Sequence, residues 1–358
     1  MSNKPNVYIE HVYCTPITEC GNVRMHYLTD SIDRAKLSEA KDSIDKVIES
    51  KREQLGLENV LPLNMSKDNA LKLCTTIKSD SVWKEGFYEV INSIAPELAS
   101  VDTSALLNAV TIPWWNVSVL GRVGDKYDAA NNELSIDASI SHSYITQLNR
   151  SPSVREIASS LKKSIPNSAE AMSISNVLVT KDNLIILGIR SGNSYANTLM
   201  ITPAGSVEYH SGENPVFETI YAEHFEELGL AKEQLKEVSL IGRIHDVSAR
   251  CSLYVSRSKT DMMFQELLSM WNSAVDNREH KFLVPVRDHP QDVMNLVLAH
   301  GYDSAKENLT SVSLTTTENV NTILPPAIGS LLVHYAQREG IAWGRKAQDM
   351  LNNMYMFR

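Results

Sequence analysis

The sequence predicts a mixed α/β protein, of α/β or α+β class, that folds as more than one domain. Its 358 residues exceed the roughly 100 to 200 residues of an ordinary domain. Apolar residues make up 43% of the chain and charged residues 22%, which is the balance of a folded globular protein. Short runs of β-branched and aromatic residues alternate with stretches whose apolar residues recur at helical spacing.

Charge and composition exclude several classes of protein. The formal net charge is −9, so we expect no extended nucleic-acid-binding face. No stretch approaches the roughly 18 apolar residues of a membrane span, and the first residues lack the apolar segment of a secretory signal. Four cysteines lie without metal-site or disulfide-framework spacing, which indicates free thiols. These features predict a cytoplasmic protein that does not enter a membrane.

Residues 1–165 are predicted to form an N-terminal α/β domain of unknown role. Alternating runs at 7–13 and 23–28 suit strands of a hairpin or a sheet edge. Apolar spacing predicts a long helix over 31–57, stopped near Gly56, and further helices across 66–101. A strand is expected over 112–120 and a helix from Ser151. The adjacent Trp114 and Trp115 could stack on a base, but we favour core packing because neighbouring strand residues point to opposite faces.

Residues 166–300 have the pattern of a second domain, and residues 301–358 that of a helical extension. Apolar runs at 176–180 and 184–190 flank a Lys-Asp-Asn turn. The remaining expected elements are strands at 198–202, 238–247, 251–256 and 281–286, and helices at 215–228, 261–274, 325–336 and 342–355. The extension is expected to pack on the preceding domain or to mediate self-association as a homo-oligomer.

The chemistry is predicted at the helix over 215–228. There Glu223, Glu226 and Glu227 fall at i, i+3 and i+4 and share one helix face. Three carboxylates on one face repel one another unless a cation lies among them, and oxygen ligands on adjacent turns suit Mg²⁺ or Mn²⁺. Gly205 in the preceding loop allows the backbone to approach the same ion. The alternative is a solvated helix face without a ligand.

This segment resembles a divergent Nudix box, whose pattern is G-x5-E-x7-R-E-U-x-E-E-x-G-U with U aliphatic. The matching positions are Gly205, Glu223, Glu226, Glu227, Gly229 and Leu230. The sequence departs from the pattern at Ala222, which replaces the arginine that orients the carboxylates, and at His224, which replaces an aliphatic residue. The loop before the helix is also longer. The resemblance covers about residues 170–300.

The resemblance implies an α/β/α sandwich with a mixed sheet and a metal-dependent pyrophosphohydrolase. Glu223, Glu226 and Glu227 would bind divalent ions with the carbonyl of Gly205, and Glu223 or Glu227 would accept a proton from the attacking water. Arg190, at the end of the second apolar run, would reach a substrate phosphate. The substrate would be a nucleotide-type small molecule, a nucleoside diphosphate derivative whose phosphoanhydride is cleaved.

Other acids and another function class stay open. Asp246, Asp261 and Glu266 could serve as a distal base, although each suits a cap or a surface charge better. His224 is expected to be a neutral packed residue. The alternative to a hydrolase is a noncatalytic Nudix-fold module that binds a nucleotide or a protein partner, because Ala222 and the long loop could have loosened the metal cradle.

Overall fold

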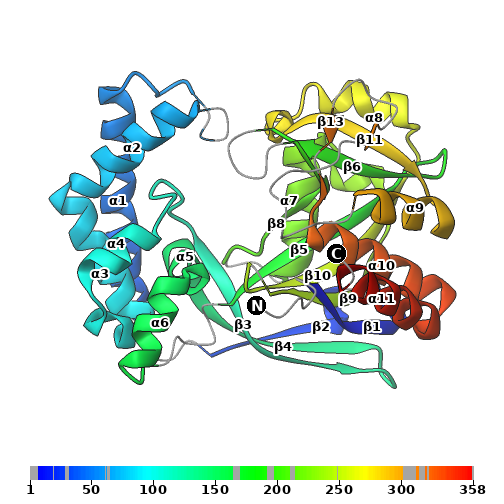
Figure 1. Ribbon diagram of the computed structural model, residues 1–358, viewed down its shortest axis with the longest axis horizontal. Coiled ribbons are helices and arrows are strands. Elements are labelled where there is room, and N and C mark those ends of the chain that lie inside the picture. The colour runs from blue at the N-terminus through cyan, green and yellow to red at the C-terminus, as the bar shows by residue number, and fades with distance from the viewer. Residues whose placement is uncertain are drawn as a thin grey trace.

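The architecture is that of a computed structural model (Figure 1). It describes residues 7–18, 20–28, 32–60, 62, 65–163, 170–191, 197–209, 214–247, 249–300, 312–313, 319–320 and 322–356. The predicted α/β class is confirmed, because helices pack around a mixed sheet. Among these residues, no helix is both long and apolar enough to cross a membrane.

Strand β5 (Ala171–Val179) is the centre of a 12-stranded sheet. It pairs in parallel with β10 (Cys251–Thr260) and antiparallel with three strands, β3 (Ser118–Asp128), β6 (Leu184–Arg190) and β8 (Ala204–Ser206). All nine of its residues are buried. Both faces of the strand are covered, so it lacks the alternation of an exposed strand, and its polar residues Ser173, Ser175 and Asn176 are buried as well.

The remaining strands extend the sheet in two directions. On one side, β10 pairs with β9 (Leu235–Asp246), which pairs with β1 (Val7–Ile17). On the other, β3 pairs with β4 (Glu133–His142), which pairs in parallel with β2 (Val23–Tyr27). Next to β6 lie β11 (His280–Arg287) and β7 (Thr198–Ile201), and β14 (Thr322–Ile323) pairs with β7. Two short strands, β12 (Val312–Ser313) and β13 (Asn319–Val320), form a separate pair.

The first two predicted strands lie at the two ends of the main strand path. They pair with β9 and β4 rather than with each other, so the sheet-edge alternative holds and the hairpin is wrong. The sheet therefore runs across the predicted boundary at residue 165. The strand predicted over 112–120 is also partly wrong, since β3 begins only at Ser118. Pro113 lies within a turn closed by a hydrogen bond from Trp115 N to Ile112 O (3.1 Å).

Helices cover both faces of the central sheet. Met172, Ile174 and Leu178 of β5 join the core beneath α7 (Pro215–Leu228) and α8 (Phe264–Trp271). Val177 and Val179 point the opposite way, into the core beneath α10 (Pro325–Glu339). This division follows from the two-residue period of a strand. The predicted helix over 215–228 is confirmed, and Gly229 ends it in the left-handed conformation (φ 73°) that glycine adopts without strain.

A third core lies between the helices of the N-terminal segment and the end of β4. Trp83 and Phe87 stack there with ring centroids 5.2 Å apart, and Tyr144 packs edge-on against both. Trp114 packs against this core, as expected. The helices are α1 (Arg34–Gln54), α2 (Lys67–Ser79), α3 (Ser81–Ile94), α4 (Thr103–Ala109), α5 (Ser143–Arg150) and α6 (Pro152–Ser160).

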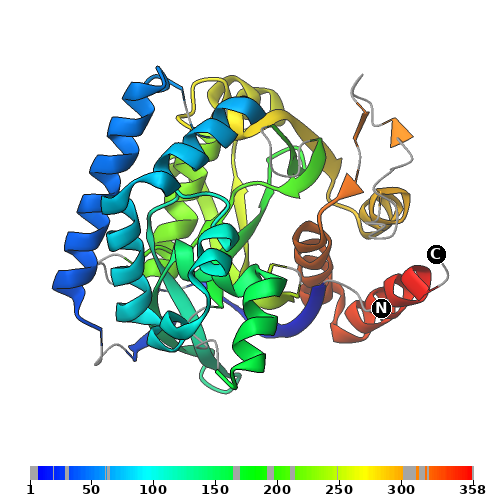
Figure 2. The same cartoon turned by 60° about the vertical axis from the view of Figure 1, so that its left-hand side comes forward.

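Helices α9 (Pro290–His300) and α11 (Ile341–Met356) complete the fold. Figure 2 shows the blue and cyan N-terminal helices at one side of the molecule and the red C-terminal helices at the other. Helix α11 packs on α10, while α9 contacts β11 and α10. The helices predicted at 325–336 and 342–355 are confirmed as α10 and α11, and α10 belongs to the layer that covers the central sheet.

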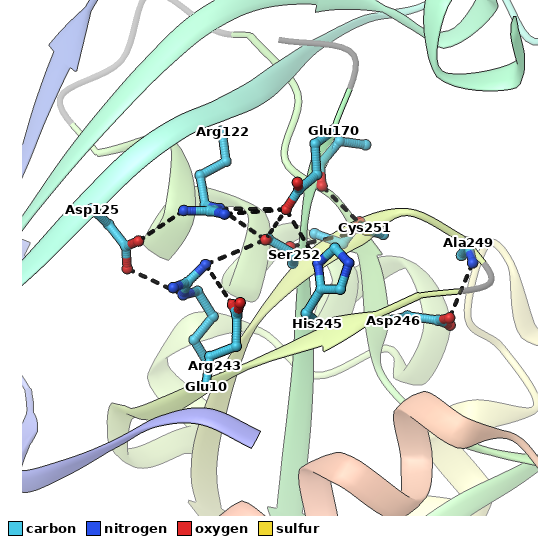
Figure 3. A network of polar contacts seen from close by, with 12 residues as sticks. Glu10, Arg122, Asp125, Glu170, Arg243, His245, Asp246, Ala249, Cys251 and Ser252 are labelled. Carbon is cyan, nitrogen blue, oxygen red and sulfur yellow. Dashed lines mark hydrogen bonds and ion pairs between the residues drawn. The ribbon is translucent and has the colours of Figure 1, made fainter. Parts of the chain in front are cut away.

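A network of ion pairs ties the N-terminal strands to the central ones (Figure 3). Arg243 of β9 pairs with Glu10 of β1 (2.7 Å) and with Asp125 of β3 (3.1 Å). Arg122 of β3 pairs with Asp125 (3.1 Å) and with Glu170 at the start of β5 (3.4 Å). Each of these charges has a partner of opposite sign, which a buried charge requires. The network therefore fixes β1 and β3 against β9 and β5.

The Glu170 carboxylate makes the stability of this junction depend on pH. Burial opposes its ionisation, but the contacts from His245 and Ser252 and the charge of Arg122 lower its pKa to about 2. Its stabilising contribution is complete above the ordinary pKa near 4.5 and is lost as the pH falls through about 2. At pH 7 it amounts to roughly 2–3 kcal/mol.

We therefore expect Glu170→Gln to lower the free energy of unfolding at pH 7 and to flatten its decline below pH 4.5. Urea unfolding of both proteins at several pH values, followed by tryptophan fluorescence, measures this difference. Parallel pH profiles for wild type and variant would show that Glu170 is not the titrating group.

Candidate metal centre

The side chain of Glu227 is the most deeply buried acid of the predicted site. It projects from the last turn of α7, and the residue is only 2% exposed. Its carboxylate accepts hydrogen bonds from Thr202 Oγ1 (2.6 Å), from the backbone N–H of Ala204 (3.2 Å) and from His280 Nε2 (3.2 Å). Burial opposes ionisation of Glu227, but these donors, with His280 foremost, lower its pKa. Glu227 is therefore held as a carboxylate.

Two residues at the start of β11 complete a group that could hold a metal ion. The group consists of Glu227, Glu279 and His280. Each contributes one possible ligand atom, and these three atoms lie within 4.8 Å of one another. His280 is the first residue of β11, where it stands opposite Arg190 of β6, and Glu279 directly precedes it. The His280 ring packs against the Cα of Gly188, where any Cβ would lie 2.3 Å from its Nδ1. The β6–β11 pairing therefore positions the imidazole.

The Glu223 carboxylate lies between Glu227 and the backbone of β8. It shares a hydrogen bond with Glu227, and burial together with the charges of Glu227, Glu279 and Glu226 raises its pKa well above the ordinary range. Its Oε1 occupies the space beside Gly205 so closely that a Cβ on Gly205 would lie 1.5 Å away. The absence of a side chain at Gly205 thus makes room for Glu223, whereas the expected approach of the Gly205 carbonyl to a metal ion stays a prediction.

Arg190 contacts the same group from the end of β6. Its guanidinium pairs with Glu279 (2.8 Å), and its side chain is 15% exposed. Burial and the charge of Glu227 raise the pKa of Glu279, while the charge of Arg190 lowers it. Arg190 therefore lies beside the acid cluster, and among the described residues its ion-pair partner is Glu279.

The remaining positions of the Nudix-like segment differ in exposure. Glu226 and Ala222 are exposed, and Glu226 is outside the three-residue group, although its charge reaches Glu223. His224 is buried; its Nδ1 donates a hydrogen bond to Ile220 O (2.6 Å), and its Nε2 is hydrogen-bonded to Ser258 Oγ (2.8 Å). Burial lowers its pKa to about 4, which confirms the neutral packed histidine that we expected.

The three candidate distal bases do not join the group. Asp246 accepts a hydrogen bond from Ala249 N (3.0 Å), Asp261 pairs with Lys236, and Glu266 accepts from Met263 N (2.7 Å) at the start of α8. They serve as turn, surface and cap residues. The residues that sequence reasoning missed are Glu279, His280 and Thr202. The only available signal was their position next to predicted strands.

Comparisons with known proteins do not assign this chain to a family. No family model matches it, and no curated protein matches it. Among solved structures, it is similar to the crystal structure of DR0079 from Deinococcus radiodurans, with 16% identity over 36% of this chain and 73% of that chain, and a TM-score of 0.28. A TM-score of this size does not establish a shared fold.

The contact between Gly205 and Glu223 gives a selective test of the centre. We expect Gly205→Ala to displace the flexible Glu223 carboxylate and so to weaken Mn²⁺ binding by roughly tenfold to a hundredfold. The fold should persist, because the clash is with the end of a side chain. Isothermal titration calorimetry with Mn²⁺ measures the affinity, and circular dichroism checks the fold.

Gly21→Ala is the matched control, since a Cβ at Gly21 meets nothing within 4 Å. It should bind Mn²⁺ as the wild type does. Equal Mn²⁺ affinities for Gly205→Ala and Gly21→Ala would show that Glu223 does not contribute to metal binding.

Proposed function

We propose that this chain is a metal-dependent pyrophosphohydrolase with a divergent Nudix-type site, which cleaves a phosphoanhydride of a nucleoside diphosphate derivative. The observation that carries the proposal is the ionised Glu227, buried beside Glu279 and His280, with Glu223 seated against Gly205. Support for a Nudix-like sandwich comes from the helices on both faces of the sheet and from the place of Glu223 and Glu227 on α7.

The donor set fits a divalent cation. Buried carboxylates repel one another, and Glu223 shows the consequence, because burial and then the charges of Glu227 and Glu279 raise its pKa. A cation held by Glu227, Glu279 and His280 would remove that repulsion. Mg²⁺ takes oxygen ligands, whereas Mn²⁺ also accepts imidazole, so the inclusion of His280 favours Mn²⁺ of the two ions first expected. When bound, the ion would neutralise phosphate charge and lower the pKa of a water molecule.

The acids of the centre divide into two roles. Three hydrogen-bond donors hold Glu227 ionised, which suits a ligand. Glu223 has a raised pKa, and a carboxyl of that kind exchanges protons closer to neutral pH than an ordinary one. We therefore assign proton transfer from the attacking water to Glu223. Thr202 and Ala204 N orient Glu227 and do not touch the substrate.

Arg190 is assigned a positioning role in place of the predicted contact with substrate phosphate. The Nudix resemblance implies an arginine at the position of Ala222 that orients the carboxylates, and Ala222 is exposed here. Arg190 brings a guanidinium to Glu279 from β6 instead. This arrangement supports a working centre despite the missing box arginine.

A noncatalytic nucleotide-binding module is the second candidate. Exposure of Glu226, which the resemblance makes a metal ligand, favours it, because fewer acids then surround the ion. The two candidates differ in turnover and not in metal binding. A substrate panel therefore separates them.

We expect Mn²⁺-dependent release of a nucleoside monophosphate from one member of a panel that contains ADP-ribose, NADH, nucleoside triphosphates, dinucleoside polyphosphates and capped RNA. Glu227→Gln should lower turnover by at least a hundredfold, since it removes the ionised ligand. Glu218→Gln, an exposed acid on the same helix, is the control and should leave turnover unchanged. Product is measured by chromatography with Mn²⁺, with Mg²⁺ and with EDTA.

Turnover that persists in Glu227→Gln would contradict the assignment. No turnover by folded wild type across the panel, together with nucleotide binding in calorimetry, would favour the binding module.

Replacement of Arg190 tests its positioning role. We expect Arg190→Gln to weaken Mn²⁺ affinity by roughly tenfold, because Glu279 loses its ion pair, while turnover at saturating Mn²⁺ stays within a few-fold of wild type. Titration of activity with Mn²⁺ gives both values. A rise in substrate KM with unchanged Mn²⁺ affinity would instead show that Arg190 binds substrate phosphate.

A further inference from the structure

A cavity of about 500 Å³ lies at the other end of β6 from the candidate metal centre. Arg190 marks the metal end of the strand, while Asn183 and Asp288 mark the cavity end, where Asp288 N donates to Asn183 O (3.0 Å). The seven residues of β6 span roughly 20 Å at about 3.3 Å per residue. The cavity is therefore distinct from the metal centre, and its volume is that of a small-molecule site.

The cavity wall carries an excess of positive charge. Five basic residues and three acidic residues line it, an excess of two positive charges, whereas the whole chain has a net charge of −9. Burial lowers the pKa of His334, which also lines the cavity, and this imidazole is neutral at pH 7. The charged residues are Lys181, Lys236, Arg257, Lys259, Arg338, Glu237, Asp261 and Asp288.

The three acids are already engaged by three of the cations. Lys236 pairs with Asp261, Lys259 with Glu237 (2.6 Å), and Arg338 with Asp288 (2.6 Å). Lys181 and Arg257 have no carboxylate partner within the described ranges. These two cations account for the excess charge that faces the cavity.

Arg257 is a half-buried cation with few partners. Its Nη1 donates to Gln337 Oε1 of α10 (3.1 Å), while its Nε is buried and pairs with no described group. Burial and the neighbouring Arg338 lower its pKa more than the charges of Asp288 and Glu237 raise it, so the charge stands in an unfavourable environment. A buried donor left unpaired destabilises the fold. A bound anion in the cavity would offset this charge.

The strands around Arg257 also depart from regular pairing. Lys236 and Lys259 stand directly opposite each other across β9 and β10, and like charges in that position are destabilising. Next to them the register shifts by one residue, and Glu237 adopts a left-handed conformation (φ 49°) that a glutamate rarely takes. Bulges and left-handed residues of this kind occur preferentially at functional sites.

We propose that this cavity binds the phosphate groups of a small phosphorylated molecule, with Arg257 and Lys181 as the principal ligands and no metal ion. The planar guanidinium of Arg257 can donate two parallel hydrogen bonds to phosphate oxygens. Lys181 supplies a point charge at the mouth. The site requires neither the metal centre nor hydrolase activity, so it stands whether or not the proposed function does.

Calorimetry with pyrophosphate, in EDTA and at constant ionic strength, tests the proposal on the full chain. We expect saturable one-site binding by wild type, at least tenfold weaker in Arg257→Gln and several-fold weaker in Lys181→Gln. The latter variant changes an exposed side chain and keeps the test valid if Arg257→Gln does not fold. Lys126→Gln, an exposed lysine of β3 outside the cavity, and Glu227→Gln should bind as wild type does.

Three results would overturn the proposal. One is the absence of pyrophosphate binding by wild type, and another is binding that neither cavity variant weakens. The third is citrate binding as tight as pyrophosphate binding, which would show a general polyanion surface without selectivity for phosphate.

Discussion

The buried charge of Glu227 is the constraint on which the arrangement of the candidate centre depends. A carboxylate that is 2% exposed requires several donors, and here three donors come from two separate segments of the chain. Thr202 and Ala204 lie where β7 passes into β8, and His280 begins β11. The β7–β8 junction, helix α7 and the start of β11 must therefore all be in place before the Glu227 carboxylate has its hydrogen-bond donors.

This dependence explains which parts of the centre could be predicted from the sequence. Glu223 and Glu227 share a helix face because of the 3.6-residue period, and both that helix and its Gly229 cap follow from local pattern. His280 contacts Glu227 across 53 residues of sequence. Its position results from the antiparallel pairing of β6 with β11, which places it opposite Arg190. No local spacing contains that information.

The fold follows the same division between local and long-range information. Most strands and helices between Ala171 and Arg287 could be predicted with approximate bounds, because each depends on periodicity and turn residues within one segment, whereas β4 was not predicted. The connection between the N-terminal segment and the rest could not. Strand β1 completes the sheet against β9, and charged residues such as Arg122 and Arg243, which look like surface residues in the sequence, are instead paired inside the junction. Burial of a charge is decided by partners far away in the sequence.

Strand β10 connects the candidate metal centre with the basic cavity. Its residues alternate in direction, so Ser258 faces α7 while Arg257 faces α10. Ser258 bonds to His224 and to Asn176 of β5 (2.7 Å), which fixes the helix that bears Glu223 and Glu227. Arg257 projects into the cavity from the neighbouring position. A shift of β10 by one residue would exchange the two faces and remove both sets of contacts. The nine-residue pairing of β10 with β5 therefore holds an acidic site and a basic site at fixed positions in one sheet.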